Sequence, residues 1–379
     1  MYAPERLNLH HELINLPLKV FLEIGFTVPN PVVSNGIFFS KDEDHYLVAY
    51  NEVDGSILWK SEVNDLWISL PLIIGNKILE RDLYTESGVI LSSKDGSVIK
   101  NLDRIRGAQW VYKNGSIYLW IYDEGDAAQI KLCCFDASEY TSNWTYAGFQ
   151  FDYYAVSNDY ILLKDDHGNL AALNLNGKEL WQLSPLDTGL FDNQGEIDNL
   201  PKSKPGFSNL NRTLGYPNIY QNRIGIAPML NNHLVGIDLA TGTVLWTRTL
   251  MSSQNWIRQG YCDEVYCLSH SHIEAFSLET GEQTKKIAID GSYITETLGK
   301  ETISFTQFAV SETHIFAASS IMHYFSAINI DTGKVEWAFQ PEYAIANDSQ
   351  PYVANGRVYY PCLSKMYIFE GQNGYVPAT

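Results

Sequence analysis

A short phrase recurs along this chain and limits what it can fold into. In its clearest copy, LVGIDLATGTVLW (234–246), Val235 and Ile237 alternate with residues that face the other way, which is the two-residue period of a β-strand. Gly242 then tolerates the positive φ of a tight turn, and Trp246 follows four residues later on a second alternating run. The phrase therefore predicts a β-hairpin, and a single hairpin has little stability alone.

The phrase appears eight times, intact or decayed, and a polar turn followed by an apolar strand precedes each copy. Clear copies are AYNEVDGSILW (49–59), ALNLNGKELW (172–181) and AINIDTGKVEW (327–337). The turn positions Gly242 and Gly281 lie 39 residues apart. A period near 40 residues with about four strands per unit is typical of a β-propeller. The count favours eight four-stranded blades, or seven if two weak copies are miscounted.

The two ends of the chain complete the ring in this interpretation. The last copy ends after Gly374 without an outermost strand, while the apolar run Leu18–Val28 belongs to no copy. Because an open ring would leave bare strand edges, we expect Leu18–Val28 to pair with the last blade and residues 1–16 to lie outside the repeat. The chain 1–379 is then one all-β domain, with insertions at 184–216 and 288–303.

The repeated phrase resembles the tryptophan-docking repeat of the PQQ-like (quinoprotein alcohol dehydrogenase-like) β-propellers. In that family the tryptophan packs between adjacent blades and the glycine makes the turn. The resemblance implies blade docking by Trp59, Trp144, Trp181, Trp246 and Trp337, and structural turns at Gly55, Gly242, Gly281 and Gly333. It implies an architecture and no particular activity, because the repeat serves packing.

Charge and cysteine content narrow the class of partner. The chain has 26 Lys and Arg against 44 Asp and Glu, a formal net charge of −18, which opposes binding to nucleic acid or to an anionic membrane. Its first twenty residues lack the basic region and the apolar stretch of a secretory signal. Five cysteines, an odd count without a disulfide framework, fit a reducing compartment. We expect a cytoplasmic protein.

No motif indicates a cofactor, a metal or a catalytic residue. Some PQQ-dependent dehydrogenases carry a disulfide between adjacent cysteines beside the cofactor. Here Cys133 and Cys134 lie in one alternating run, where neighbours face opposite sides of a strand. His270 and His272 share a face, but two ligands are too few for a metal site. We therefore expect no cofactor and no enzymatic activity.

The insertion at 184–216 is the main candidate for partner binding. A loop of more than about 15 residues without secondary structure is uncommon in a compact domain and is often functional. This one combines acids with apolar groups, which suits a protein-binding loop, although a lid packed on its own propeller is the equal alternative. The candidate partner-binding residues are Asp187, Phe191, Asp192, Glu196, Asp198 and Phe207.

These observations favour a non-enzymatic protein-binding scaffold. The specific hypothesis is a bacterial immunity protein that occludes a cognate, basic toxin domain, because acidic loops would complement a basic surface. One alternative is a quinoprotein-like oxidoreductase that uses PQQ and calcium. The other is a structural adaptor in a multiprotein assembly, like the propeller scaffold of outer-membrane assembly.

Overall fold

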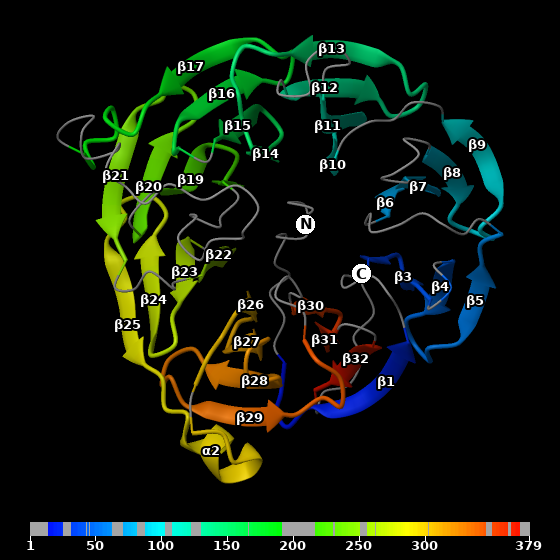
Figure 1. Ribbon diagram of the computed structural model, residues 1–379, viewed down its shortest axis with the longest axis vertical. Helices are drawn as coiled ribbons and strands as arrows, with labels where there is room; N and C mark the ends of the chain where they lie inside the picture. Colours follow the sequence, from blue (N-terminus) through cyan, green and yellow to red (C-terminus); the bar gives the residue numbers. More distant parts are fainter. Residues whose placement is uncertain are drawn as a thin grey trace.

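Eight antiparallel sheets of four strands each stand around a common centre in the computed structural model, so the fold is a β-propeller (Figure 1). The structure describes residues 14–25, 32–42, 44, 46–62, 71–81, 88–102, 108–122, 130–165, 167–191, 217–229, 232–250, 256–261, 263–301, 303–345, 351–362 and 365–371. The predicted all-β ring of eight blades is confirmed, and the seven-blade alternative is wrong.

Each blade is a meander whose first strand lies nearest the centre and whose last strand forms the rim (Figure 1). Blades 1 to 4 contain β2 (Val32–Ser34), β3 (Ile37–Lys41), β4 (Leu47–Asn51), β5 (Ile57–Lys60); β6 (Leu72–Ile74), β7 (Lys77–Arg81), β8 (Gly88–Ser92), β9 (Val98–Leu102); β10 (Ala108–Lys113), β11 (Ser116–Tyr122), β12 (Ile130–Asp136), β13 (Ser142–Tyr146); and β14 (Tyr153–Val156), β15 (Tyr160–Lys164), β16 (Leu170–Asn174), β17 (Glu179–Leu183). Blades 5 to 8 contain β18 (Asn218–Tyr220), β19 (Ile224–Met229), β20 (His233–Asp238), β21 (Val244–Thr249); β22 (Trp256–Tyr261), β23 (Glu264–Leu268), β24 (His272–Ser277), β25 (Gln283–Ala288); β26 (Gln307–Val310), β27 (His314–Ser319), β28 (Tyr324–Asn329), β29 (Val335–Phe339); and β30 (Tyr352–Ala354), β31 (Arg357–Pro361), β32 (Lys365–Glu370), β1 (Lys19–Gly25).

The two middle strands of a blade are buried on both faces. In β15, Ile161, Leu162 and Leu163 are each 0% exposed, although neighbouring residues of a strand point to opposite sides. Both sides are apolar because the adjacent blades pack against both faces of the sheet. The rim strands are more exposed than the middle strands, and in β5 only Trp59 is buried.

The ring closes through the N-terminal strand. β1 pairs antiparallel with β32, from Lys19 opposite Glu370 to Gly25 opposite Lys365, so the first residues of the repeat region complete the last blade. The predicted closure by the run that begins at Leu18 is confirmed. An ion pair with 2.8 Å between Lys365 Nζ and Glu23 Oε2 joins the same two strands.

A buried polar network joins blade 8 to blade 1. The Arg357 side chain is 1% exposed; its Nε donates to Glu370 Oε1 at 2.9 Å, and its Nη2 donates to the Val53 carbonyl oxygen at 3.2 Å. Tyr359 OH and Asn355 Nδ2 donate to Glu52 Oε1 at 3.0 and 2.7 Å. Burial, together with the Glu52 carboxylate, holds the pKa of Tyr359 far above its usual value, so the phenol remains a donor.

The predicted blade-docking tryptophans lie between blades. Each indole N–H donates to a backbone carbonyl in the outer hairpin of the following blade. The four pairs are Trp59 with Ser93 at 3.1 Å, Trp144 with Leu175 at 2.9 Å, Trp181 with Leu239 at 2.8 Å and Trp246 with Leu278 at 2.8 Å. Trp337 is 6% exposed and packs against Phe369 of blade 8, with ring centroids 5.0 Å apart. The rings therefore seal the blade boundaries.

The turn glycine of the following blade makes room for each ring. A Cβ added to Gly242 would lie 2.8 Å from the Trp181 ring, and one added to Gly281 would lie closer than 3.0 Å to the Trp246 ring. Gly333 has a different reason, since its Cβ would meet the Ala288 carbonyl. Gly55 adopts a φ of 72°, as its turn requires. Two further glycines beneath docking rings, Gly96 and Gly177, were missing from the sequence-based set.

We expect Gly281→Ala to destabilise the fold by about 2 kcal/mol more than Gly75→Ala, because the new methyl group overpacks the Trp246 ring. Both glycines have a positive φ, 63° and 58°, and a Cβ on Gly75 meets nothing within 4 Å. Gly75→Ala thus reports the backbone strain alone. The measurement is the free energy of unfolding in urea, and equal losses for the two variants would contradict the packing role.

One blade boundary exchanges both partners of the docking pair. Lys100 stands in blade 2 where five other copies have tryptophan, and Tyr140 stands in blade 3 where the other copies have glycine. Tyr140 adopts a φ of 57°, and its ring lies 5.6 Å from Lys100 Nζ and 5.5 Å from Lys77 Nζ. At this boundary the large ring belongs to the following blade instead of the preceding one, and it interacts with two lysines of blade 2.

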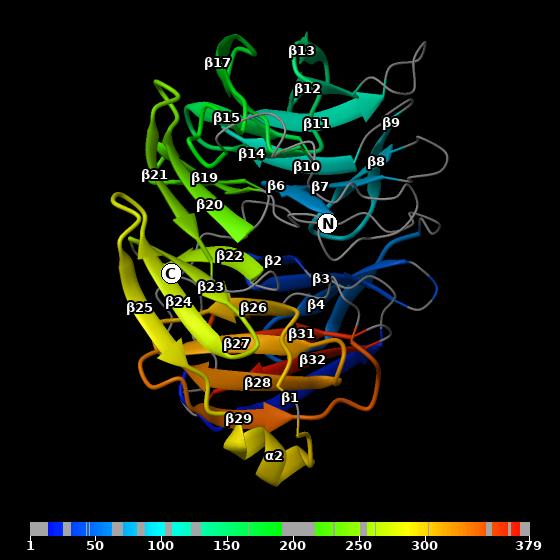
Figure 2. The same cartoon turned by 60° about the vertical axis from the view of Figure 1, so that its left-hand side comes forward.

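The insertion at 288–303 contains a helix, α2 (Ser292–Leu298), which lies at the rim beside β29 (Figure 2). Ile294 is fully buried against that blade. Immediately before the helix, Asp290 forms an isolated parallel bridge with Lys334, and the Val335 N–H donates to the Asp290 carbonyl at 3.0 Å. The insertion therefore covers the outer strand of blade 7.

Candidate protein-binding surface

The blades present two different faces to solvent. On one, the turn between the first and second strands meets the outer hairpin: the Glu52 N–H donates to the Gly36 carbonyl at 3.0 Å, and the Leu278 N–H to the Asp263 carbonyl at 2.8 Å. We call this the turn face. The opposite loop face carries the turns between the second and third strands and the connections between blades. Its connections include the longer segments of the chain, among them the insertion at 184–216.

Polar side chains of the turn face bond to one another across blade boundaries. The Asn158 N–H of blade 4 donates to Asn222 Oδ1 of blade 5 at 2.7 Å. Gln221 Nε2 of blade 5 donates to Asp263 Oδ1 of blade 6 at 2.5 Å. In blades 4 to 6 this face therefore uses its polar groups to hold neighbouring blades together.

The insertion predicted to bind a partner belongs to the loop face, and the structure describes its beginning. Asp187 is exposed, but its Oδ2 accepts from the backbone N–H and the hydroxyl of Ser184, both at 2.7 Å. These hydrogen bonds lower the pKa of Asp187 because they favour the charged carboxylate. The carboxylate therefore stabilises its own turn.

Phe191 lies inside the molecule. Its side chain is 8% exposed and meets His233 edge-on, with ring centroids 6.1 Å apart. Leu190 packs against the buried residues of blade 5. This part of the insertion is packed on its own propeller. Four other predicted residues, Asp192, Glu196, Asp198 and Phe207, lie outside the described residues, and the partner-binding role of the set stays a prediction.

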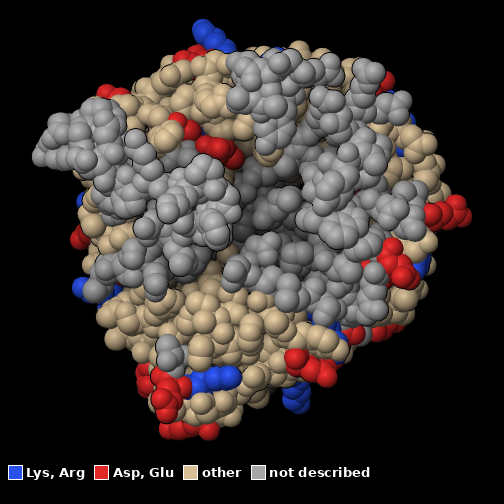
Figure 3. All heavy atoms as spheres, in the orientation of Figure 1, with Lys and Arg blue, Asp and Glu red and all other residues tan. Residues whose placement is uncertain are grey.

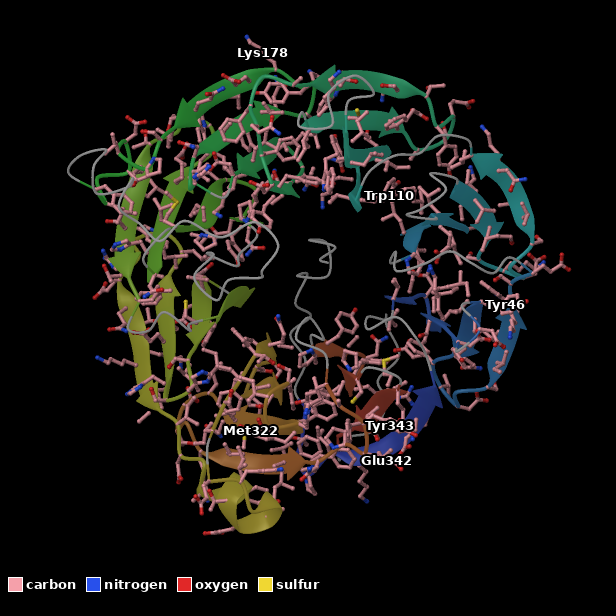
Figure 4. All side chains as sticks on the ribbon, viewed as in Figure 1. Tyr46, Trp110, Lys178, Met322, Glu342 and Tyr343 are labelled. Atoms are coloured by element: carbon pink, nitrogen blue, oxygen red, sulfur yellow. The ribbon has the colours of Figure 1, made fainter. Side chains whose placement is uncertain are left out.

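An exposed patch on the loop face spans blades 7 and 8, and sequence analysis did not single it out. Ile321, in the turn between β27 and β28, is 66% exposed, and Tyr343, in the connection after β29, is 40% exposed. The Ile345 N–H donates to His323 Nδ1 at 3.3 Å, which ties that connection to that turn. We call Ile321, Met322, Glu342 and Tyr343 the loop-face patch; Figure 4 labels the last three of them.

A lysine anchors the charged end of this patch. Lys365 Nζ lies 4.8 Å from the Tyr343 ring centroid, 2.8 Å from Glu23 Oε2 and 3.6 Å from Glu342 Oε2. The hydrogen bond to Glu23 raises the pKa of Lys365, so the amine is charged at neutral pH. The patch thus combines apolar side chains with a fixed ion pair, a composition that suits protein recognition.

On the face shown in Figure 3, acidic side chains of the described residues lie at several separate places around the molecule. Among the described residues, no group of three His, Cys, Asp or Glu side chains could hold a metal ion. His270 Nδ1 accepts from the Phe305 N–H at 3.2 Å, and His272 Nδ1 lies 2.9 Å from Ser271 Oγ. The two histidines that the sequence places on one strand face therefore each lie within hydrogen-bonding distance of a neighbouring group.

The adjacent cysteines do not fit a cofactor-side disulfide. Cys133 and Cys134 are buried free thiols in β12. Cys134 lies opposite Trp144 in the strand register, where it is the small residue that leaves room for the ring. Burial raises the pKa of both thiols, which makes them unreactive. Among the described residues, these two cysteines form no disulfide with each other.

Comparison with known families identifies the propeller. Residues 22–287 match the family described as outer membrane protein assembly factor BamB. The chain belongs to this family. No curated protein matches this BamB-family propeller by sequence.

Solved structures with the same fold are distant in sequence. BamB from Moraxella catarrhalis is 14% identical, with a TM-score of 0.64 over 93% of this chain and 100% of that one. The computationally designed Ika8 protein is 11% identical, with a TM-score of 0.63 over 97% and 100%. Quinohemoprotein alcohol dehydrogenase from Comamonas testosteroni is 10% identical, with a TM-score of 0.61 over 96% of this chain and 78% of that one. At these identities the likeness shows the fold alone.

The part of this BamB-family chain that the structure describes includes no helix with the length and apolar character needed to span a bilayer.

Proposed function

We propose that this chain is a non-enzymatic scaffold that binds other proteins within a multiprotein assembly. The family match carries this proposal, because the matching family is described as an assembly factor. The rigid ring and the exposed loop-face patch support it, since a fixed surface of apolar side chains around an ion pair is what a protein partner needs.

The family match favours the assembly adaptor over the immunity protein. The immunity hypothesis rests on a stand-alone propeller, on the absence of a catalytic motif in the sequence and on the net charge of −18, and such a charge also has a general role in solubility. A cytoplasmic location, which five cysteines without a disulfide framework favour, is likewise a proposal, which cell fractionation would test. Recovery of the protein in the envelope fraction would contradict a cytoplasmic location.

The test places a photoreactive benzoylphenylalanine at Tyr343 in cells, with Ser142 as the matched control. Ser142 is an exposed residue on the rim of blade 3, away from the loop-face patch. We expect a cross-link to another protein from position 343 and none from 142. A component of an envelope assembly as the partner supports the adaptor, whereas a secreted toxin supports the immunity protein. Absence of any protein cross-link at position 343 would count against the patch as a binding site.

The quinoprotein alternative has its own measurement. The purified chain is titrated with PQQ and calcium while its thermal midpoint and the absorbance of the quinone are recorded. We expect neither to change. A ligand that binds the folded state with a concentration of 100 times its Kd stabilises that state by about 2.7 kcal/mol, so binding would raise the midpoint visibly. Such a rise would favour the oxidoreductase.

A further inference from the structure

Large apolar side chains are exposed along one part of the rim. Ile57 is 64% exposed, Val53 56%, Ile99 50% and Leu58 48%. Val98 and Val20 are each 44% exposed. These six residues belong to three consecutive blades, 8, 1 and 2, and we call them the rim strip. Single exposed apolar residues are ordinary, but a run of them across adjacent elements marks an interaction surface.

Contacts between the blades connect the parts of the rim strip. At the boundary of blades 1 and 2, the Trp59 ring lies against Gly96. Leu58 precedes Trp59 and Val98 follows Gly96 by two residues, so both belong to the segments that meet at this contact.

At the boundary of blades 8 and 1, Arg357 lies 3.7 Å from the Phe21 ring centroid and also donates to the Val53 carbonyl. Phe21 follows Val20 in β1, so Val20 and Val53 lie on either side of this contact. The strip therefore has residues on both sides of two blade boundaries.

The same two positions are polar in blades 3 and 6 and partly covered in blade 7, whereas blades 4 and 5 each expose one leucine there, Leu180 and Leu245. The two residues before the docking position are Ser142 and Asn143 in blade 3, and Gln283 and Thr284 in blade 6, all exposed.

In blade 7 the first of these positions is Val335, which is 0% exposed because the 288–303 insertion lies over it, paired through Asp290 and packed through Ile294. In blade 7 the outer strand β29 is thus covered by a segment of polypeptide that packs an apolar side chain, Ile294, against it.

The charges along the strip differ from those of the whole chain. The rim strands of blades 1 and 2, ILWK and VIKNL, contain Lys60 and Lys100 and no acid. The exposed acids of the turns that precede them, Asp54 and Asp95, accept hydrogen bonds from Ser56 and Ser97 of their own turns. Lys60 is ion-paired with Asp42 at 2.6 Å, whereas Lys100 is exposed beside the Tyr140 ring. An acidic residue of a binding partner would complement Lys100.

We infer that the rim strip docks a segment of a partner protein that combines apolar side chains with acidic ones. This inference rests on the proposed scaffold function and adds a second surface to it. A second copy of the chain fits poorly, because a symmetric contact would oppose two strips with the same lysines and bring together two bodies of charge −18. An anionic lipid surface would meet the same net repulsion.

The experiment compares residues at one repeat position. Leu58 and Ile99 belong to the strip, while Leu180 and Leu245, 39% and 37% exposed, are their equivalents on the rims of blades 4 and 5. Benzoylphenylalanine is placed at each position in cells, and the cross-linked segment is identified by mass spectrometry and synthesised as a peptide. We expect cross-links at 58 and 99 to one apolar, acidic segment of another protein, and none at 180 or 245.

The synthetic peptide then tests the surface with purified protein. We expect Leu58→Glu and Ile99→Glu to weaken its binding at least tenfold, and Leu180→Glu to leave it unchanged, with equal thermal midpoints for all three variants. Lys100→Met should weaken binding of the acidic peptide but not of a peptide in which its acids are replaced by amides. Equal binding by all variants would overturn the inference.

Other outcomes separate this inference from the scaffold function. Cross-links to a second copy, to lipid or to nothing at 58 and 99 overturn the rim strip as a docking surface. If position 343 still cross-links to a protein, the scaffold function stands without it. If neither surface cross-links to a protein, both proposals fall.

Discussion

Trp246→Ala should lower the free energy of unfolding by about 3–5 kcal/mol, the usual cost of removing a large buried aromatic side chain. Trp246 is 5% exposed, and its ring fills the boundary between blades 5 and 6 against Gly281. Its indole N–H also donates to the Leu278 carbonyl at 2.8 Å. The variant leaves a cavity and also leaves the Leu278 carbonyl without that donor. The free energy of unfolding in urea measures the two losses together.

Leu245→Ala is the control for this prediction. Leu245 precedes Trp246 on the same strand and is 37% exposed, so its truncation should cost less than about 1 kcal/mol. Trp246→Phe keeps a ring but lacks the N–H, and we expect an intermediate loss. If Trp246→Ala and Leu245→Ala had similar effects, the ring would not seal the boundary.

The repeat itself could be predicted from sequence because residues close together in the chain specify each hairpin. A turn glycine and a tryptophan four residues later specify one hairpin, and the spacing of hairpins specifies the ring. The partners across each boundary were harder to see. Gly96 and Gly177 make room for rings of the preceding blade, yet they lie about forty residues from them in the chain. The rule that each ring needs a glycine in the next copy would have found both.

Polar contacts between residues far apart in the chain could not be predicted from a local sequence pattern. The network of Arg357 with Val53 and of Tyr359 with Glu52 joins residues more than 300 positions apart, and no local pattern announces it. The exchange of tryptophan and glycine for Lys100 and Tyr140 looked like decay of the repeat. In the structure it is a changed docking pair, because the large ring now stands on the other blade.

The candidate surfaces also show what local composition cannot decide. Phe191 has the character of an exposed anchor in sequence, but it is buried against His233. Ile57 and Leu58 look like ordinary strand residues, yet they are exposed because no segment among the described residues lies over the rim of blade 1 as the 288–303 insertion lies over Val335 in blade 7. Whether a rim side chain is buried depends on which distant segments pack over it, and this packing is set by the tertiary structure of the closed ring.

Arg357→Ala should lower the free energy of unfolding by about 3–5 kcal/mol, the range for breaking a buried ion pair by removing one partner. The guanidinium is 1% exposed and bonds to Glu370 within blade 8 and to the Val53 carbonyl of blade 1. It also lies over the Phe21 ring of the closing strand. One side chain thus connects β31, β32, β1 and the outer hairpin of blade 1, so its loss weakens the closure of the ring.

Arg223→Ala provides the matched surface change. The Arg223 side chain is 53% exposed and lies 3.8 Å from Asp238 and 3.7 Å from Glu279. Exposed pairs of this kind contribute about 0–1 kcal/mol, so we expect little change in stability. Because closure depends on Arg357, hydrogen exchange in β1 should accelerate in Arg357→Ala more than exchange in β20 and β21 of blade 5. Uniform acceleration across the blades would show that this arginine stabilises the fold without a special role at the seam.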